Sequence, residues 1–436
     1  MNTPKIFLGK ILNNIPYTFM PKVGIVYNNY RKDILEYETC KDKWDWIFRR
    51  VYNIVEYAIN NIQFYQDFYK FRGFDINELN SFEDISKIPI LTKSDLINIP
   101  IETRSVSNSS CRLANTGGST GMPLSFYKTQ SHRIKEMAFY HSAWEKIGYR
   151  KHKLRLQFVG RSEQNGCTYD FARNQIRVSI YEPFDLVLHE LSQLPNFCQV
   201  EFLQGYPSVI YEFALYCSSH NKEYVSSKLN DTLKGIFFNS EYPNPFYRNV
   251  IEKTFNVKTI ASYGHTEGCA LGFDYGDGVY EVLQSYGYCE SISMQDGEHL
   301  VATSYDNFVS PFIRYDTNDI VENACIKECI LNSFTMNEGG RSGQYITDID
   351  GKNISLTGLI FGKHHKIFNY CSQLQISQSE QGKAIIYYVP KNGLPKNFNP
   401  KEMFDSDGIS IEFSFKEIQE PIRTKAGKVL LLVKEQ

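Results

Sequence analysis

The stretch from residue 200 to residue 260 reads VEFLQGYPSVIYEFALYCSSHNKEYVSSKLNDTLKGIFFNSEYPNPFYRNVIEKTFNVKTI, and it carries the pattern that decides the fold. Short apolar runs suited to strands alternate in it with longer segments suited to helices. Strands are predicted at Val200–Gln204, Leu233–Phe238 and Val257–Ile260, with helices between them at Pro207–Ser218 and Pro245–Phe255. This alternation indicates an α/β fold with a mainly parallel sheet, because a crossover helix returns the chain to begin each parallel strand at the same edge.

Polar turns follow two of these strands, at the edge of the sheet where ligands bind in such folds. Ser240 and Glu241 follow the second strand, and the third strand runs into Tyr263, Gly264, His265, Thr266 and Glu267. Tyr263 can stack on a base, Thr266 can bond a phosphate oxygen, and the carboxylate of Glu267 suits a magnesium ion beside phosphates. The alternative for the second turn is a helix start with a favourable Glu, and both interpretations stay open on these residues alone.

Upstream lies a glycine-rich stretch, Leu113–Leu124, which reads LANTGGSTGMPL. Its glycines allow the backbone N–H groups to turn inward on an anion, and its hydroxyls can add further hydrogen bonds. The residues concerned are Thr116, Gly117, Gly118, Ser119, Thr120 and Gly121. A flexible connector is the alternative, but threonines on both sides of the glycines and a stiffening proline favour a phosphate-binding loop. Neither the Walker pattern nor G-x-G-x-x-G is present in this stretch.

The sequence pattern also predicts helices and strands in the segments on either side of this loop. Apolar residues recur at helical spacing over Trp46–Ile62, which predicts a scaffold helix. Further on, Ile88–Leu91 is predicted to be extended, and Thr92 with Asp95 forms a capping box for a short helix. Beyond the loop we expect a helix over 131–147 and a buried strand over 154–160.

The last third of the chain changes character. A strand is expected over 300–304, followed by 311–319, where Asp319 can bind ribose hydroxyls. Three glycines within Glu338–Gly343 indicate a hinge or linker. Short strands over 384–389, 409–415 and 429–433, with a small helix between them, then predict a compact α+β domain.

Total composition bounds the class of protein. The 436 residues exceed one ordinary core, so two or more domains are expected. A formal net charge of −2 gives no electrostatic case for a nucleic-acid partner. No apolar run reaches the roughly 18 residues of a membrane span, and no secretory segment is evident, so a cytoplasmic location is expected. The ten cysteines are then expected to be reduced thiols.

Taken in order, these motifs resemble those of the adenylate-forming superfamily, in particular its phenylacetate-CoA ligase and CapK-like branch. The loop from Thr116 is similar to the phosphate loop of that family, Tyr263–Glu267 to its adenine and magnesium motif, and 313–319 to its ribose motif. Gly340-Arg341 resembles the hinge entry, and Thr424–Lys428 the C-terminal lysine motif. Residues 89–96 are similar to a segment of the CapK branch.

The resemblance implies a large N-terminal adenylation domain, residues 1–341, and a mobile C-terminal lid domain, residues 342–436, joined by a glycine-rich hinge. It implies Lys428, Glu267 and Thr120 as catalytic residues, Glu267 as the metal ligand, and Arg341 among the nucleotide-binding residues. Two departures are visible. Asn318 stands where the family usually has glycine, and Ser342-Gly343 stands where an acidic pair commonly follows, which moves the hinge to Gly343.

The implied reaction is ATP-dependent activation of a small carboxylic acid, with Mg²⁺, through an acyl-adenylate and with release of pyrophosphate. Acyl transfer to an amine or hydroxyl in surface polysaccharide synthesis is slightly preferred, with an amino sugar or an alcohol as acceptor. The phenylacetate branch implies CoA instead. A nucleotide-binding scaffold without turnover is the alternative from another class, and Glu267, Asp319 and Lys428 argue against it.

Overall fold

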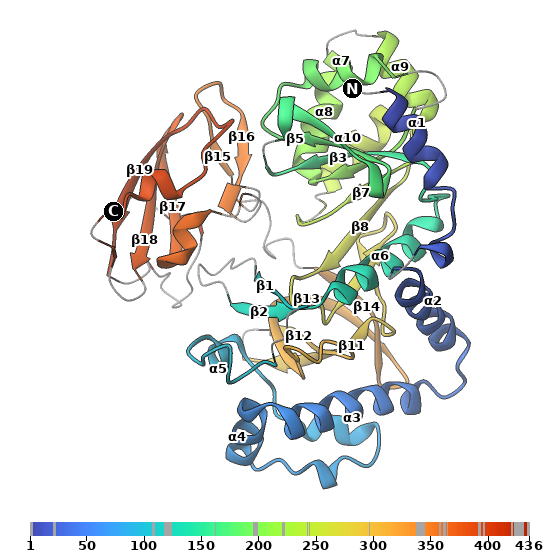
Figure 1. Ribbon diagram of the computed structural model, residues 1–436, viewed down its shortest axis with the longest axis vertical. Coiled ribbons are helices and arrows are strands. Elements are labelled where there is room, and N and C mark those ends of the chain that lie inside the picture. Colours follow the sequence, from blue (N-terminus) through green and yellow to red (C-terminus); the bar gives the residue numbers. More distant parts are fainter. Residues whose placement is uncertain are drawn as a thin grey trace.

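The structure is a computed structural model. It describes residues 3–20, 23–106, 110–116, 124–161, 163–194, 199–219, 223–241, 243, 245–295, 297–336, 345–356, 359–360, 363, 365–390, 394–395, 397–419, 422 and 431–433. Figure 1 shows a large body built on one long sheet, with a smaller part, β15 to β19, beside it.

The long sheet has twelve strands in the order β11-β12-β13-β14-β10-β9-β8-β7-β6-β3-β5-β4. Its parallel section, β5-β3-β6-β7-β8, confirms the strands predicted from the alternation. The strands of this half are β3 (Leu154–Val159), β4 (Cys167–Asp170), β5 (Gln175–Ser179), β6 (Val200–Gly205), β7 (Gly235–Phe238) and β8 (Thr259–Gly264). Around them lie α7 (Phe184–Ser192), α8 (Pro207–Ser219), α9 (Glu223–Thr232) and α10 (Pro245–Phe255) (Figure 1).

The other half of the sheet is antiparallel throughout, and so is the edge pair β4-β5, so the expectation of mainly parallel pairing holds for the section β5-β3-β6-β7-β8. Its strands are β9 (Leu271–Asp274), β10 (Val279–Val282), β11 (Gly287–Met294), β12 (Gly297–Ser304), β13 (Tyr315–Lys327) and β14 (Ile330–Met336). Short connections such as Gln295–Asp296 leave no room for a crossover helix, so successive strands here return as hairpins. The α/β class is confirmed.

The predicted scaffold helix is α3 (Lys43–Asn61), which packs under the antiparallel half of the sheet (Figure 1). Its N-cap is Asp42, whose side chain accepts a hydrogen bond from the Asp45 N–H at 2.9 Å. One face is fully buried, and Trp46 meets Tyr305 edge to face with ring centroids 5.7 Å apart. The other helices of the first 145 residues are α1 (Thr3–Leu12), α2 (Gly24–Thr39), α4 (Gln63–Arg72), α5 (Lys93–Ile97) and α6 (Gln130–Glu145), of which α4 packs against α3.

A small ribbon connects this framework to the glycine-rich loop. It consists of β1 (Arg112–Asn115) and β2 (Ser125–Lys128), which pair antiparallel. Upstream of it, the capping box of Thr92 and Asp95 is confirmed at the start of α5. Just before that box, Leu91 bridges Tyr315 in parallel, so the segment similar to the CapK branch is fixed to the start of β13.

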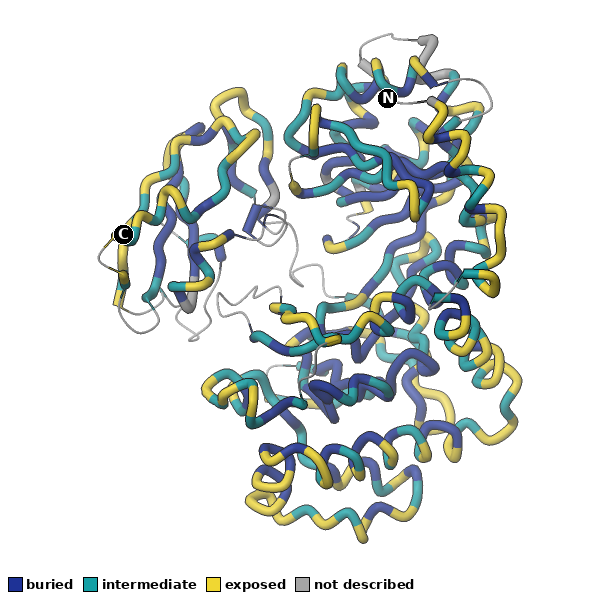
Figure 2. Tube along the Cα trace, viewed as in Figure 1, coloured by how far each residue is buried: buried dark blue, intermediate teal, exposed yellow. Residues whose placement is uncertain are grey.

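The C-terminal part has its own apolar cluster, which includes Ile346, Ile367, Ile376, Ile386 and Phe404. Its strands are β15 (Tyr345–Thr347), β16 (Asn353–Ser355), β17 (Cys371–Glu380), β18 (Lys383–Pro390) and β19 (Glu412–Glu417), and α12 (Pro400–Met403) is its short helix. Figure 2 shows buried residues concentrated along the strands of both parts. The predicted boundary between residues 341 and 342 lies outside the described residues and stays a prediction. No helix in the described part of the chain is long and apolar enough to cross a membrane.

Candidate functional site

The base of the glycine-rich loop is closed by Thr116. Its N–H donates to the Leu124 carbonyl at 2.9 Å, and its Oγ1 accepts from the Leu124 N–H at 2.9 Å. Because Thr116 is buried, its hydroxyl holds the two ends of the loop together before any ligand binds. The other predicted loop residues, Gly117, Gly118, Ser119, Thr120 and Gly121, lie outside the described residues.

The turns after β7 and β8 lie side by side, as the parallel sheet requires. Phe238 pairs with Ala261, which puts Asn239 and Ser240 next to Ser262 and Tyr263 at the carboxyl ends of the two strands. Ser240 has a φ of 67°, in the left-handed region, so the chain bends sharply as it leaves β7.

The structure joins the predicted adenine motif to the predicted ribose motif. The hydroxyl of Tyr263 donates a hydrogen bond to Oδ2 of Asp319 at 2.8 Å, although the two residues are 56 positions apart. The Tyr263 ring also meets Phe334 edge to face, with centroids 5.2 Å apart. Asp319 is buried, and its N–H donates to Thr317 Oγ1, so the carboxylate is held in one place.

Glu267 lies in the same region. Its Oε1 accepts a hydrogen bond from the hydroxyl of Tyr315 at 3.3 Å, and its Oε2 lies 3.2 Å from Nδ1 of His265. Burial disfavours the charged imidazole, but Cys269 and the Glu267 carboxylate outweigh it and raise the pKa of His265 well above its usual value. Hydrogen-bonding groups on Tyr315 and His265 thus hold the two oxygens of the Glu267 carboxylate in position.

Such a carboxylate fits a magnesium ion. Mg²⁺ usually takes one or two carboxylates from the protein and completes its shell with phosphates and water. The residues that the structure describes contain no cluster of three or more His, Cys, Asp or Glu side chains that could hold a metal ion.

Charged groups that the sequence analysis did not single out lie next to this turn. Lys128 on β2 and His132 on α6 approach Oε1 of Glu136 at 3.9 Å and 3.6 Å. Gly268, with φ of 70°, packs on His132 so closely that an added Cβ would lie 2.1 Å from its ring. The spacing of four between His132 and Glu136 was the only sequence signal for this cluster.

Asn318 departs from the family pattern without a conformational penalty. Its φ is 58°, the left-handed conformation that explains a glycine at this position and that asparagine tolerates better than most residues. Its N–H donates to Oδ1 of Asp316 at 2.8 Å. Arg341 and Lys428 lie outside the described residues, so their roles stay predictions.

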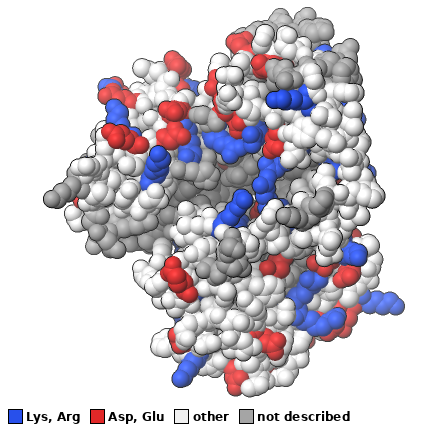
Figure 3. All heavy atoms as spheres, in the orientation of Figure 1, with Lys and Arg blue, Asp and Glu red and all other residues white. Residues whose placement is uncertain are grey.

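The C-terminal part touches the large sheet just after the end of β5. Lys352 Nζ donates to the Ile180 carbonyl at 3.0 Å, and Lys363 lies over the Tyr181 ring at 4.5 Å. Figure 3 shows Lys and Arg side chains gathered around the hollow between the two parts. A polyanionic ligand suits such a surface.

Glu212 on α8 provides a pH prediction at this contact. Burial raises its pKa from 4.5 to about 7, Lys352 opposes this shift, and Glu241 and Asp348 add to it. Because the folded pKa is the higher one, the stability that Glu212 contributes is fully present below pH 4.5 and is lost as the pH rises through 7. Each pKa unit corresponds to at most about 1.4 kcal/mol, and partial solvent access reduces it.

Glu212→Gln is therefore expected to raise the Tm by a few degrees at pH 8 and to change it little at pH 5. Thermal unfolding at the two pH values measures this. Glu56→Gln, on the exposed face of α3, is the control and should leave the difference between the two pH values as in the unaltered protein. Equal shifts for Glu212→Gln at both pH values would contradict the assignment.

Comparisons with known proteins bear on the fold of the chain. No family model matches the sequence. Protein CapK of Staphylococcus aureus is 24% identical over 442 residues, which cover 96% of this chain and 93% of CapK. A solved structure of 2-hydroxyisobutyryl-CoA ligase in the postadenylation state, in complex with R3-HIB-AMP, has a TM-score of 0.54 and 16% identity, with 91% of this chain and 90% of that chain covered.

The same ligase in complex with 2-HIB-AMP and CoA, in the thioesterification state, has a TM-score of 0.53 and 17% identity over 91% of this chain and 90% of that chain. These likenesses confirm the predicted fold over both the large and the small part.

Proposed function

We propose that this chain, which has the fold of the adenylate-forming superfamily and resembles its CapK-like branch, activates a small carboxylic acid with ATP. The acid carboxylate attacks the α-phosphorus, pyrophosphate leaves, and an acceptor then opens the acyl-adenylate. The observation that carries this proposal is the contact between Tyr263 and Asp319 beside Glu267, because it unites motifs for adenine, ribose and magnesium at one edge of the sheet.

The residues of the chain act by binding and charge stabilisation more than by proton transfer. Asp319 would bind the ribose hydroxyls, while Tyr263 covers the base and keeps Asp319 oriented. Ser240, Glu241, Gly264 and Thr266 would complete the nucleotide contacts, and the loop from Thr116 to Gly121 would bind the phosphates. Magnesium, held at Glu267, supplies positive charge beside the phosphates. Arg341 and Lys428 would come from the hinge and the C-terminal domain.

Acid-dependent exchange of labelled pyrophosphate into ATP, without CoA, is the expected result for this proposal. The acid panel should include aryl, aliphatic, amino and uronic acids, because the sequence does not identify the acid. Exchange requires both formation and reversal of the acyl-adenylate, so it reports adenylation without the acceptor. If ATP binds but no acid supports exchange, the scaffold alternative is favoured.

The acceptor is the finer part of the proposal. The resemblance to CapK favours an amine or hydroxyl acceptor in surface polysaccharide synthesis, whereas the fold is shared with a ligase solved with CoA. Products formed with CoA, with hydroxylamine and with an amino sugar can be compared by mass spectrometry. A thioester formed much faster than any amine product would assign the chain to CoA ligation.

A further inference from the structure

A cavity of about 250 Å³ opens at the carboxyl end of β3, next to the candidate site but not part of it. Residues from several elements line it, among them Gln157, Arg161, Arg173, Arg177, Tyr206 and Asn239. Its volume is below the roughly 300–1,000 Å³ of pockets that enclose whole drug-sized ligands, so it suits one charged group of a larger molecule.

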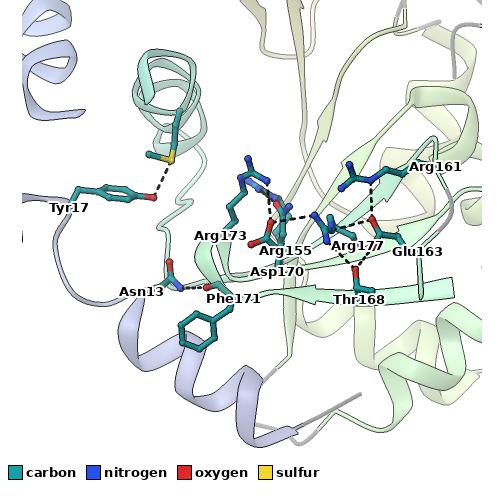
Figure 4. Close-up of polar contacts among 12 residues, drawn as sticks. Asn13, Tyr17, Arg155, Arg161, Glu163, Thr168, Asp170, Phe171, Arg173 and Arg177 are labelled. Carbon is teal, nitrogen blue, oxygen red and sulfur yellow. Dashed lines mark hydrogen bonds and ion pairs between the residues drawn. The ribbon is translucent and has the colours of Figure 1, made fainter. Parts of the chain in front are cut away.

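The cavity carries an excess of positive charge. Its three arginines share two carboxylates, those of Glu163 and Asp170, as Figure 4 shows. Arg161 Nε lies 3.1 Å from Glu163, and Arg173 Nη1 lies 3.1 Å from Asp170.

Donor groups of these arginines are left for a ligand. Among the described residues, the hydrogen bonds of Arg161 and Arg173 use one nitrogen of each guanidinium. The other nitrogens can still donate, and paired guanidinium groups bind phosphate better than any other side chain does.

The arginines of the cavity lie several strands away from the turn that carries Glu267. Arg173 and Arg177 lie just before and on β5, whereas Glu267 follows β8, and β7, β6 and β3 lie between these two strands. At about 4.8 Å per strand, four steps across the sheet span roughly 19 Å. Arg173 and Arg177 are therefore set apart from Glu267, whereas Asn239, which also lines the cavity, follows β7, the strand next to β8.

The cavity is close to the C-terminal part instead. β5 ends at Ser179, and Lys352 of the C-terminal part donates to the carbonyl of the next residue, Ile180. Asn239 lines the cavity and donates a hydrogen bond to Ser240 at the end of β7. A molecule that enters between the two parts and extends toward the end of β7 therefore passes this cavity.

We propose that Arg161, Arg173 and Arg177 form a subsite for a phosphate or pyrophosphate group of the acyl acceptor. The acceptor is then a phosphate-bearing carrier, either a CoA-type thiol or a nucleoside-diphosphate sugar, and not a free amine or alcohol. The identification of this compound as the acyl acceptor rests on the proposed function. Its binding, however, can be measured without any adenylation.

The test is a calorimetric titration of the full chain with CoA, dephospho-CoA, a uridine-diphosphate amino sugar and phosphate-free pantetheine. At least one phosphate-bearing compound should bind, and pantetheine should not. The affinities for CoA and dephospho-CoA, compared with the affinity for the sugar nucleotide, distinguish a CoA-type thiol from a nucleoside-diphosphate sugar as the carrier. Arg161→Gln and Arg173→Gln should each weaken binding about 10- to 100-fold, as expected for loss of one charge-assisted hydrogen bond. Arg173→Lys should retain part of the affinity.

Arg49→Gln is the matched control, because Arg49 also pairs with a nearby carboxylate, that of Asp45, but on the exposed face of α3. It should bind as the unaltered chain does. The proposal is overturned if none of the phosphate-bearing compounds binds, or if Arg161→Gln and Arg173→Gln bind them unchanged. Pyrophosphate exchange by the unaltered chain is measured in parallel, so a failure of the adenylation proposal appears there and not in the titrations.

Discussion

Replacing Lys428 with alanine is expected to slow adenylation by about 10²-fold or more, the effect of losing one preorganised charge-stabilising donor. Adenylation concentrates negative charge around the α-phosphate and the incoming carboxylate, and Lys428 is the cation that the resemblance assigns to them. The subsequent acyl transfer should use another face of the C-terminal domain. Lys428→Ala supplied with synthetic acyl-adenylate should therefore transfer the acyl group at nearly the unaltered rate.

The short segment 431–433, which follows Lys428, is bridged to β17, and this makes the substitution interpretable. Leu431 accepts a hydrogen bond from the Ile376 N–H at 2.7 Å, and the Val433 N–H donates to the Ile376 carbonyl at 2.8 Å. Loss of the Lys428 side chain should therefore not detach residues 431–433 from β17. Pyrophosphate exchange measures the first half-reaction, and product formation from the adenylate measures the second.

Lys383→Ala is a suitable control, since Lys383 lies on β18 of the same part and pairs with the exposed Glu380. Equal loss in both half-reactions of Lys428→Ala would show that Lys428 supports the fold or both domain orientations. Undiminished adenylation would place the critical cation elsewhere, and Lys425 in the same turn would be tested next.

The parts of the fold that were predictable from sequence are those with a strong local signal. Helical periodicity located α3, the alternation of strand and helix located β6 to β8, and the pair Thr92 and Asp95 located the start of α5. Each depends on residues a few positions apart, so no knowledge of the partners was required.

The antiparallel half of the sheet was not predictable in the same way. β13 is thirteen residues long, yet the sequence indicates residues 315–319 only as part of the segment similar to the ribose motif and not as a strand, because polar residues dominate there without an apolar run. Its strand conformation comes from pairing with β12 and β14. Tertiary pairing of this kind overrides local propensity.

The candidate site shows the same division. The motifs named Tyr263, Glu267 and Asp319, but the hydrogen bond from Tyr263 to Asp319 depends on how β8 and β13 meet across the sheet. The arginines of the cavity at β3 carried no motif at all. Arg161, Arg173 and Arg177 come from separate positions around β4 and β5, and only the turn between these strands brings them together.

Arg314 illustrates a residue whose role changes once its contacts are known. In the sequence it is part of the segment similar to the ribose motif, but the structure buries it as a clamp. Its Nε and Nη2 donate to the two carboxylate oxygens of Glu290 at 2.9 Å and 3.1 Å. Its Nη1 donates to the carbonyls of Ser86 and Ile88, each at 2.6 Å.

Arg314→Ala is therefore expected to destabilise the chain by about 3–5 kcal/mol, the usual cost of removing one partner from a buried ion pair. Burial already raises the pKa of Glu290, and Arg314 is the group that opposes this shift. Without the guanidinium, Glu290 and two backbone carbonyls would be left buried without their donor. Denaturant unfolding of the full chain measures the loss.

Two further variants separate the ion pair from simple packing. Arg314→Lys keeps the charge but not the two-pronged geometry, so it should lose a smaller part of the stability. Removing both charges in Arg314→Met with Glu290→Leu should recover much of what Arg314→Ala loses, because no unpaired carboxylate then remains. A double variant as unstable as Arg314→Ala would mean that the carbonyls of Ser86 and Ile88, not Glu290, depend on the arginine.

A surface pair gives the scale for this comparison. Arg49 lies 2.7 Å from Asp45, and the two side chains are 67% and 51% exposed, so Arg49→Ala should cost only about 0–1 kcal/mol. The larger loss at Arg314 follows from its location, because the clamp fixes residues 86–91 against the start of β13. That strand carries Asp319, so Arg314→Ala should also weaken nucleotide binding under conditions where the variant is still folded. Unchanged nucleotide affinity in the folded variant would show that the position of Asp319 does not depend on this clamp.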